Sequence, residues 1–180
     1  MTFSSLELTY PAAASVCAVI GSITDVKSRK IPNLITFPAF AFGVLMHLVL
    51  NGWKSSLVAL AAGLICGMVF LVFYIAGGMG AGDVKLITAV GCIAGMSHIY
   101  SIMVLTALSG GVMAICLALF RGRFKQTFLN VIALASHHAH QGLQAHPDLN
   151  VSNEKTLRLP YALAIASGCI LTLSIQIVSR

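Results

Sequence analysis

The stretch Ser55–Ala76, with the sequence SSLVALAAGLICGMVFLVFYIA, contains no charged side chain. An apolar run of this length is long enough for an α-helix to cross the hydrocarbon core of a bilayer. The whole chain has the same character, because 58% of its 180 residues are hydrophobic, 9% are charged and its mean hydropathy is +0.92. A soluble domain needs more charge to keep its surface solvated. The sequence therefore predicts an integral membrane protein.

Five further apolar segments lie on either side of this stretch. They cover about Leu8–Val26, Asn33–Leu50, Val84–Met96, Ile99–Phe120 and Pro160–Val178. The segment from Val84 is short and would extend only about 20 Å as a helix. We therefore predict an all-α fold, a polytopic membrane helix bundle of about six transmembrane helices. Residues 1–180 are expected to form a single membrane-embedded domain.

The basic residues are distributed unevenly over the connections between these segments. Nine of the 11 fall on one side of the membrane in a six-span topology, namely Lys27, Arg29, Lys30, Lys85, Arg121, Arg123, Lys125, Lys155 and Arg158. Only Lys54 and Arg180 fall on the other side. Because positively charged loops stay in the cytoplasm, both termini are expected to face outward. The net charge of +6 thus orients the chain in lipid, and we expect no nucleic acid partner.

The long connection over residues 121–159 is predicted to be cytoplasmic. Phe124, Phe128, Ile132 and Ala135 recur at helical spacing, which favours an amphipathic helix at the membrane surface. A histidine cluster follows, at His137, His138, His140 and His146. Its spacing matches no zinc pattern and the five cysteines form no CxxC pair, so we expect neither a metal site nor a disulfide framework.

Two of the five acidic residues, Asp25 and Asp83, stand at the predicted cytoplasmic ends of apolar segments. A carboxylate near the membrane is costly and is usually functional or anchoring. Two nearby carboxylates cannot both ionise cheaply, so one can hold a proton while the other activates a water molecule. Such a pair can hydrolyse a peptide bond. The residues alone leave open which aspartate takes which role, and an interfacial aspartate without a catalytic role is the alternative for each.

The residues around the two aspartates carry further signals. Residues 77–83, GGMGAGD, place four glycines before Asp83, which disfavours a continuous helix and permits close approach of another chain. Pro32 biases Ile31 away from helix and should separate the first two segments. Asn33 is expected to cap the second helix. Lys85 lies too close in sequence to Asp83 to share its helical face, so we expect it to anchor the chain.

Three stretches resemble motifs of a known family. GAGDVKL at residues 80–86 matches the GxGD motif of membrane aspartic proteases, in a form similar to that of type IV prepilin peptidases. DVKSRKIPN at residues 25–33 is similar to the first aspartate motif of that family. LPYALAIA at residues 159–166 resembles its late Pro-aromatic segment. The three motifs follow the family order over most of the chain.

The resemblance implies a membrane aspartic endopeptidase without a cofactor, in which Asp25 and Asp83 are catalytic. It implies supporting roles for Gly80, Gly82, Lys85, Pro32, Asn33 and Pro160. The implied substrates are prepilins or pseudopilins, cleaved at the cytoplasmic face of the bacterial inner membrane, with a pilus or secretion assembly system as partner. The cysteine-rich methyltransferase region of many family members is not seen. The chain therefore resembles the short peptidase-only form of tight-adherence (Flp) pilus systems.

Two other functions stay open. The chain could be a GxGD protease with different substrates, such as signal peptides or membrane stubs. It could also be a proton-coupled carrier, because intramembrane acids serve transport in such proteins. The carrier hypothesis leaves the glycine-rich loop before Asp83 and the Ile-Pro-Asn element unexplained.

Overall fold

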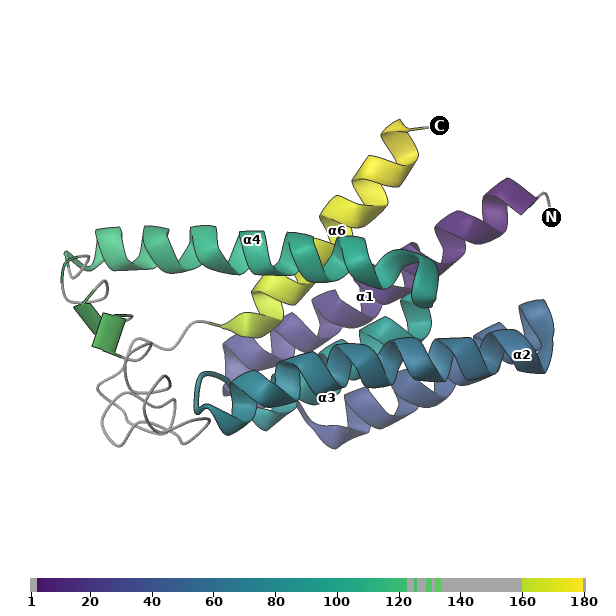
Figure 1. The fold of residues 1–180 in the computed structure, drawn as a ribbon, viewed down its shortest axis with the longest axis horizontal. Helices are drawn as coiled ribbons and strands as arrows, with labels where there is room; N and C mark the ends of the chain where they lie inside the picture. Colours follow the sequence, from purple (N-terminus) through teal and green to yellow (C-terminus); the bar gives the residue numbers. More distant parts are fainter. Residues whose placement is uncertain (1–2, 123–124, 126–128, 131, 134–159, 180) are drawn as a thin grey trace.

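The structure is a computed structural model that describes residues 3–122, 125, 129–130, 132–133 and 160–179. Its helices are α1 (Phe3–Ser28), α2 (Asn33–Ile75), α3 (Ala81–Ala94), α4 (Met96–Phe120) and α6 (Tyr161–Val178). They lie against one another as a bundle (Figure 1), and the described residues contain no strand, so the all-α prediction is confirmed. The expected amphipathic helix and the histidine-rich loop lie largely outside the described residues.

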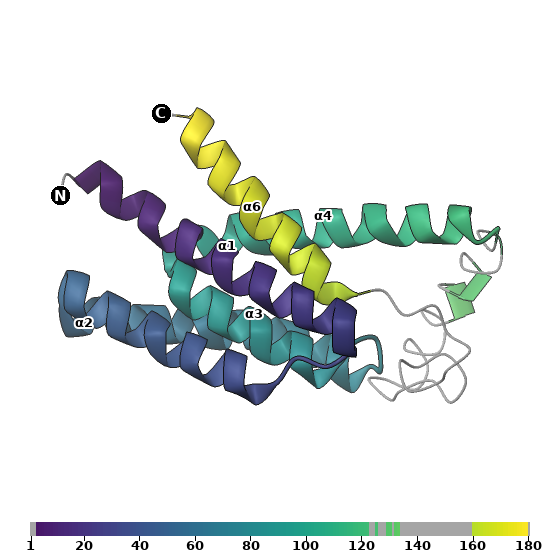
Figure 2. The same ribbon diagram turned by 180° about the vertical axis from the view of Figure 1, so that it is seen from behind.

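Helix α2 consists of two limbs that meet at Gly52. This glycine has φ 82° and ψ 178°, a backbone conformation that residues with a side chain rarely adopt. The limbs, residues 33–51 and 53–75, fold back on each other (Figures 1 and 2), and the Ser56 hydroxyl donates to the Val44 carbonyl at 3.1 Å. They correspond to the two separate apolar segments expected on either side of residue 52.

Three helices, α2, α4 and α6, are long and apolar enough to cross a membrane. Helix α3 has 14 residues and corresponds to the short segment expected from Val84. Large apolar side chains cover much of the outer surface of the described residues, as expected where lipid replaces water. The finding supports a membrane protein, while the number of about six transmembrane helices stays a prediction.

Helix α3 is the central element of the bundle and packs mainly against α2. Leu86, Ile87 and Val90 are completely buried. Glycines permit this close packing, because a Cβ atom on Gly63 would lie 2.8 Å from the Thr88 carbonyl oxygen and one on Gly67 would collide with the Thr88 hydroxyl. Gly63 and Gly67 therefore allow the backbones of α2 and α3 to approach closely.

The elements that carry the sequence motifs end together at one end of the bundle. Helix α1 ends there, α2 begins and ends there, and α3 and α6 begin there (Figures 1 and 2). The connections from α1 to α2 and from α2 to α3, together with the start of α6, thus lie at this end of the bundle. The prediction that Asp25 and Asp83 lie at the same end is confirmed.

Candidate active site

Asp83 occupies the third position of α3, and its side chain is only 8% exposed. Its Oδ2 atom accepts a hydrogen bond from the Gly80 backbone N–H at 3.2 Å. A carboxylate is favourable at a helix N-terminus, where backbone N–H groups are unpaired. A Cβ atom on Gly80 would lie 3.3 Å from Oδ2, so the glycine leaves room for this closed turn. The glycine-rich loop therefore holds the carboxyl group of Asp83 by its backbone.

The second oxygen of Asp83, Oδ1, is buried and has no hydrogen-bond partner in the described part of the chain. Burial, followed by the charge of Asp25, raises the pKa of Asp83 to about 6, against the opposing effect of the Gly80 N–H. Oδ2 is engaged as an acceptor, so Oδ1 is the oxygen that can carry a proton. Asp83 thus keeps its proton up to a pH of about 6, well above the pH at which an ordinary aspartate loses it.

Asp25 lies in the last turn of α1 and is half-buried. The helix ends one turn later, where Arg29 adopts a left-handed conformation with φ 52° and its N–H donates to the Asp25 carbonyl at 2.7 Å. Asp25 is close enough to Asp83 for its charge to contribute to the raised pKa of Asp83. The structure therefore brings together the two aspartates that the sequence placed 58 positions apart.

The connector between α1 and α2 packs against the start of α3. Ile31 is buried, and a Cβ atom on Gly82 would lie 3.1 Å from the Cβ atom of Ile31. Only a residue without a side chain fits this contact comfortably. Lys85 Nζ donates a hydrogen bond to Asn33 Oδ1 at 2.9 Å. Ile31 therefore contacts the residue before Asp83, and Asn33 contacts the side chain two residues after it.

The prediction that Asn33 caps the second helix is wrong. Pro32 is the N-cap residue of α2, with φ −66° and ψ 144°, and no side chain caps this end. The Pro32 carbonyl accepts the N–H of Ile35 at 3.0 Å, which closes the first turn. Asn33 is already inside the helix, and its amide oxygen accepts from Lys85 instead. Pro32 separates α1 from α2, as the sequence predicted.

Pro160 is the N-cap residue of α6, and its carbonyl accepts the Leu163 N–H at 3.0 Å. The next residue, Tyr161, is half-buried against the hydrophobic core and interacts electrostatically with Asp83. Sequence reasoning did not single out Tyr161 as a site residue. The available signal was its place directly after Pro160 in the late Pro-aromatic segment. Tyr161 brings a phenol group to the neighbourhood of the aspartates.

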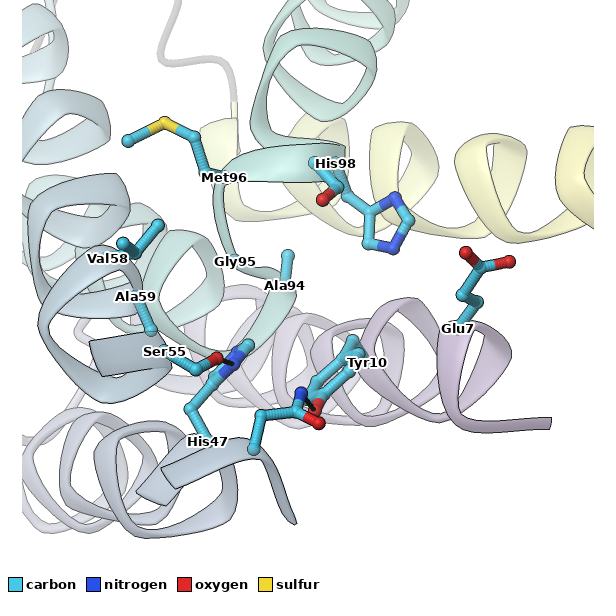
Figure 3. A pocket seen from close by; sticks show the side chains of 12 residues that line it. Glu7, Tyr10, His47, Ser55, Val58, Ala59, Ala94, Gly95, Met96 and His98 are labelled. Atoms are coloured by element: carbon cyan, nitrogen blue, oxygen red, sulfur yellow. Dashed lines mark hydrogen bonds between the residues drawn. The ribbon is translucent and has the colours of Figure 1, made fainter. Parts of the chain in front are cut away.

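A polar cavity of about 220 Å³ lies at the other end of the bundle (Figure 3). It is lined by residues from the start of α1, the Gly52 turn and the turn from α3 to α4, including Glu7, Tyr10, His47, Asn51, Ser55 and His98. Glu7 and Asp25 are eighteen positions apart on α1, which corresponds to about 27 Å of helix. The cavity is therefore separate from the aspartate pair.

The polar groups of this cavity satisfy one another. The His47 ring stacks on Tyr10 at a centroid distance of 4.3 Å, and Tyr10 accepts from Asn51 Nδ2 at 2.6 Å. His47 Nε2 lies 3.1 Å from the Ile93 carbonyl. His47 Nδ1 lies 3.2 Å from the Ser55 hydroxyl (Figure 3). A carbonyl oxygen can only accept, so Nε2 carries the proton. The cluster thus joins four helical segments through internal hydrogen bonds.

The chemistry that the structure offers is concentrated at the aspartates. A buried carboxyl group with a raised pKa interacts electrostatically with a better solvated one. Such an arrangement provides an acid and a base at the same pH. The described residues contain no group of three or more His, Cys, Asp or Glu side chains able to hold a metal ion.

Comparisons with known proteins converge on one family. Residues 12–115 match the type IV leader peptidase family, and this region includes Asp25, the connector and Asp83 but not Pro160. The chain is 32% identical over 112 residues to the prepilin leader peptidase/N-methyltransferase of Bacillus subtilis (strain 168). The match covers 59% of the chain and 43% of that relative, so the chain spans less than half of the relative's length. No solved structure matches the chain. Because the family match extends over more than half of the chain, the protein belongs to the type IV leader peptidase family.

Proposed function

We propose that this protein is an aspartic endopeptidase that removes the leader peptide of type IV prepilins or pseudopilins. The observation that carries the proposal is the pairing of Asp25 with a buried Asp83 whose pKa is raised to about 6. Family membership supports the reaction class, because both aspartates lie within the matched residues. The resemblance to short tight-adherence enzymes supports Flp-like prepilins as substrates.

In the proposed mechanism, Asp83 holds the proton and Asp25 is ionised, because Asp83 is the more deeply buried of the two. Asp25 takes a proton from a water molecule while the water oxygen forms a bond to the scissile carbonyl carbon. Asp83 donates its proton from Oδ1 to the carbonyl oxygen, giving a neutral tetrahedral intermediate. Asp25 then returns its proton to the leaving nitrogen as the C–N bond breaks. Asp83 recovers a proton from the intermediate as the new carboxyl group forms, so both groups end as they began.

The predicted topology suits this substrate class. With both termini outward, the end of the bundle that carries Asp25 and Asp83 faces the cytoplasm, where Lys27, Arg29, Lys30 and Lys85 also lie. A prepilin presents a basic leader on that side, followed by a hydrophobic helix in the membrane. The scissile bond at this boundary would meet the aspartates at the ends of their helices. We therefore place the enzyme in the bacterial inner membrane with its site at the cytoplasmic face.

The proposal is tested by replacing each aspartate with asparagine and co-expressing a Flp-like prepilin. Asp25→Asn and Asp83→Asn should each abolish leader removal, because each leaves the pair without an acid or a base. Immunoblots that resolve prepilin from pilin measure the outcome. Glu7→Gln is the matched control, since Glu7 is a carboxylate on α1 at the far end and should be dispensable for cleavage.

Full processing by either aspartate variant would contradict the proposed mechanism. Cleavage of signal peptides or membrane stubs by the wild-type protein, with prepilins left intact, would contradict the proposed substrate class. Each variant must also be present in the membrane at the wild-type level, which immunoblots of the membrane fraction establish.

A further inference from the structure

The two aspartates belong to elements that are distant in the sequence and must be held at a fixed separation. Asp25 lies at the end of α1 and Asp83 at the start of α3, with the two limbs of α2 between them in the chain. Hydrolysis by a pair of aspartates depends on positioning of this kind, because a displacement of a reacting group by about 1 Å can reduce the rate by about 100-fold. The contacts that join the two motifs are therefore of direct interest.

Deeper in the bundle, α1 and α3 pack directly, since a Cβ atom on Gly21 would lie 2.6 Å from Leu86 Cδ1. This contact lies about one turn away from each aspartate along its helix. At the aspartates themselves, the connector supplies the contacts. Ile31 packs on Gly82, and Asn33 accepts a hydrogen bond from Lys85 at 2.9 Å.

We infer that Asn33 and Lys85 form a positioning pair that fixes Asp83 relative to Asp25, an inference that rests on the proposed function. Lys85 lies two residues after Asp83 in the first turns of α3. Asn33 is the first residue of α2, directly after the connector that follows α1 and Asp25. On the exposed side, the hydrogen bond between the Asn33 and Lys85 side chains joins the start of α2 to the start of α3. On the buried side, the packing of Ile31 on Gly82 joins the connector to the start of α3.

The chemical nature of the pair fits this role. Asn33 offers a neutral oxygen to the ammonium group of Lys85, so the contact is charge-assisted without adding a third carboxylate beside the aspartates. A further negative charge would raise the pKa of Asp83 above the value that burial and Asp25 already produce. Asn33 and Lys85 are thus positioning residues, and neither needs to touch the substrate.

The pair makes a prediction that anchoring by Lys85 does not make. Asn33→Leu removes the acceptor and Lys85→Met removes the ammonium group. Each should lower kcat for a prepilin substrate by about fivefold, the size expected when one solvent-exposed hydrogen bond is lost. KM should stay within twofold. The double variant should be no slower than the slower single variant, because both changes break the same contact.

A reciprocal exchange provides the sharpest test. Asn33→Lys combined with Lys85→Asn restores a donor and an acceptor across the same gap and should recover at least half of wild-type kcat. Lys30→Met is the matched control, because Lys30 is an exposed cation of the same connector. If Lys85 only anchors the chain, Lys30→Met and Lys85→Met will behave alike and Asn33→Leu will be silent, which would overturn the inference.

A second measurement is independent of catalysis. The pKa of Asp83 can be followed in the purified full chain by carboxyl infrared difference spectroscopy, with Asp83→Asn to assign the band. Asn33→Leu should lower this pKa as Asp83 moves away from Asp25. An unchanged pKa together with unchanged kcat would overturn the positioning role. Failure of the wild-type protein to cleave any prepilin would instead contradict the proposed function, and the infrared result would still report on the pair.

Discussion

At the scale of single residues, Asp83 shows how burial and function oppose each other. The residue is 8% exposed, one carboxyl oxygen has no hydrogen-bond partner among the described residues, and its pKa is raised from the ordinary value of 3.8 to about 6. The folded protein therefore holds this proton more tightly than the unfolded chain does. Linkage then requires that the contribution of Asp83 to stability decreases as the pH rises from about 4 to about 6.

We therefore predict that Asp83→Asn stabilises the protein at neutral pH. The gain should be small at pH 4, where Asp83 is protonated in the folded protein and about half protonated in the unfolded chain, and should rise to about 3 kcal/mol at pH 7. Asparagine keeps an acceptor for the Gly80 N–H, so the turn before α3 is preserved. Thermal unfolding of purified protein in detergent between pH 4 and pH 7 measures the effect. A variant less stable than wild type at pH 7 would contradict the assigned cause of the raised pKa.

At the scale of elements, the packing of α2 on α3 sets the position of the site. Gly67→Val would push a branched side chain into Thr88. The Thr88 hydroxyl donates a hydrogen bond at 2.7 Å to the carbonyl of Val84, the residue that follows Asp83. Overpacking of this kind costs about 1–3 kcal/mol, so a lower melting temperature and a lower kcat are expected together.

Gly111→Ala in α4 is the control for this prediction, because a Cβ atom added there would have no neighbour within 4 Å among the described residues that pack against α4. Alanine is the better helix former, so this variant should melt at the wild-type temperature or slightly above it. Equal losses in Gly67→Val and Gly111→Ala would contradict the assigned role of the α2–α3 contact.

The helical elements were largely predictable from the sequence because their apolar segments are long and uninterrupted. The segment expected from Val84 to Met96 is the helix Ala81–Ala94, which starts earlier because Gly80 acts as the N-cap and Ala81 and Gly82 join the first turn. The prediction started the helix at Val84 because the glycines before Asp83 disfavour a helix.

Other features of the site could not be derived from local sequence. The hydrogen-bond partner of Asn33, Lys85, is 52 positions away in the sequence. Local sequence rules therefore predicted Asn33 as the N-cap of α2, a position that Pro32 occupies. The left-handed conformation of Arg29, the unpaired oxygen of Asp83 and the proximity of Tyr161 arise only when α1, α3 and α6 converge. Motif resemblance identified the aspartates, whereas their burial and unequal environments required the fold.

At the scale of the whole molecule, the bundle is chemically polarised along its length. One end carries Asp25 and Asp83, and the other carries His98 and the internally bonded cluster around Tyr10 and His47. His98 Nδ1 lies 2.8 Å from Gln176 Nε2, which ties α4 to α6 at that far end. The polar cluster thus joins the helices at one end of the bundle, while the connector and the glycine-rich loop hold the end that carries Asp25 and Asp83.

This polarity gives a prediction for membrane orientation. In a background without the five native cysteines, Lys30→Cys should react with a membrane-impermeant maleimide only from the cytoplasmic side. Lys54→Cys should react only from the outside, because it lies near the Gly52 turn at the far end. Labelling of intact cells and of inverted vesicles measures the two accessibilities. The reverse pattern would contradict the proposed cytoplasmic location of the aspartates.

The unpaired Oδ1 of Asp83 also bears on inhibitor chemistry. A buried polar atom without a partner costs about 1–3 kcal/mol, and a ligand that supplies the missing hydrogen bond regains that free energy on binding. A secondary alcohol in a non-cleavable peptide, placed where the tetrahedral carbon would form, meets this requirement. Compared with the same compound lacking the hydroxyl, it should gain about ten- to a hundredfold in affinity. Oδ1 of Asp83 is thus the atom toward which selective ligands are best aimed.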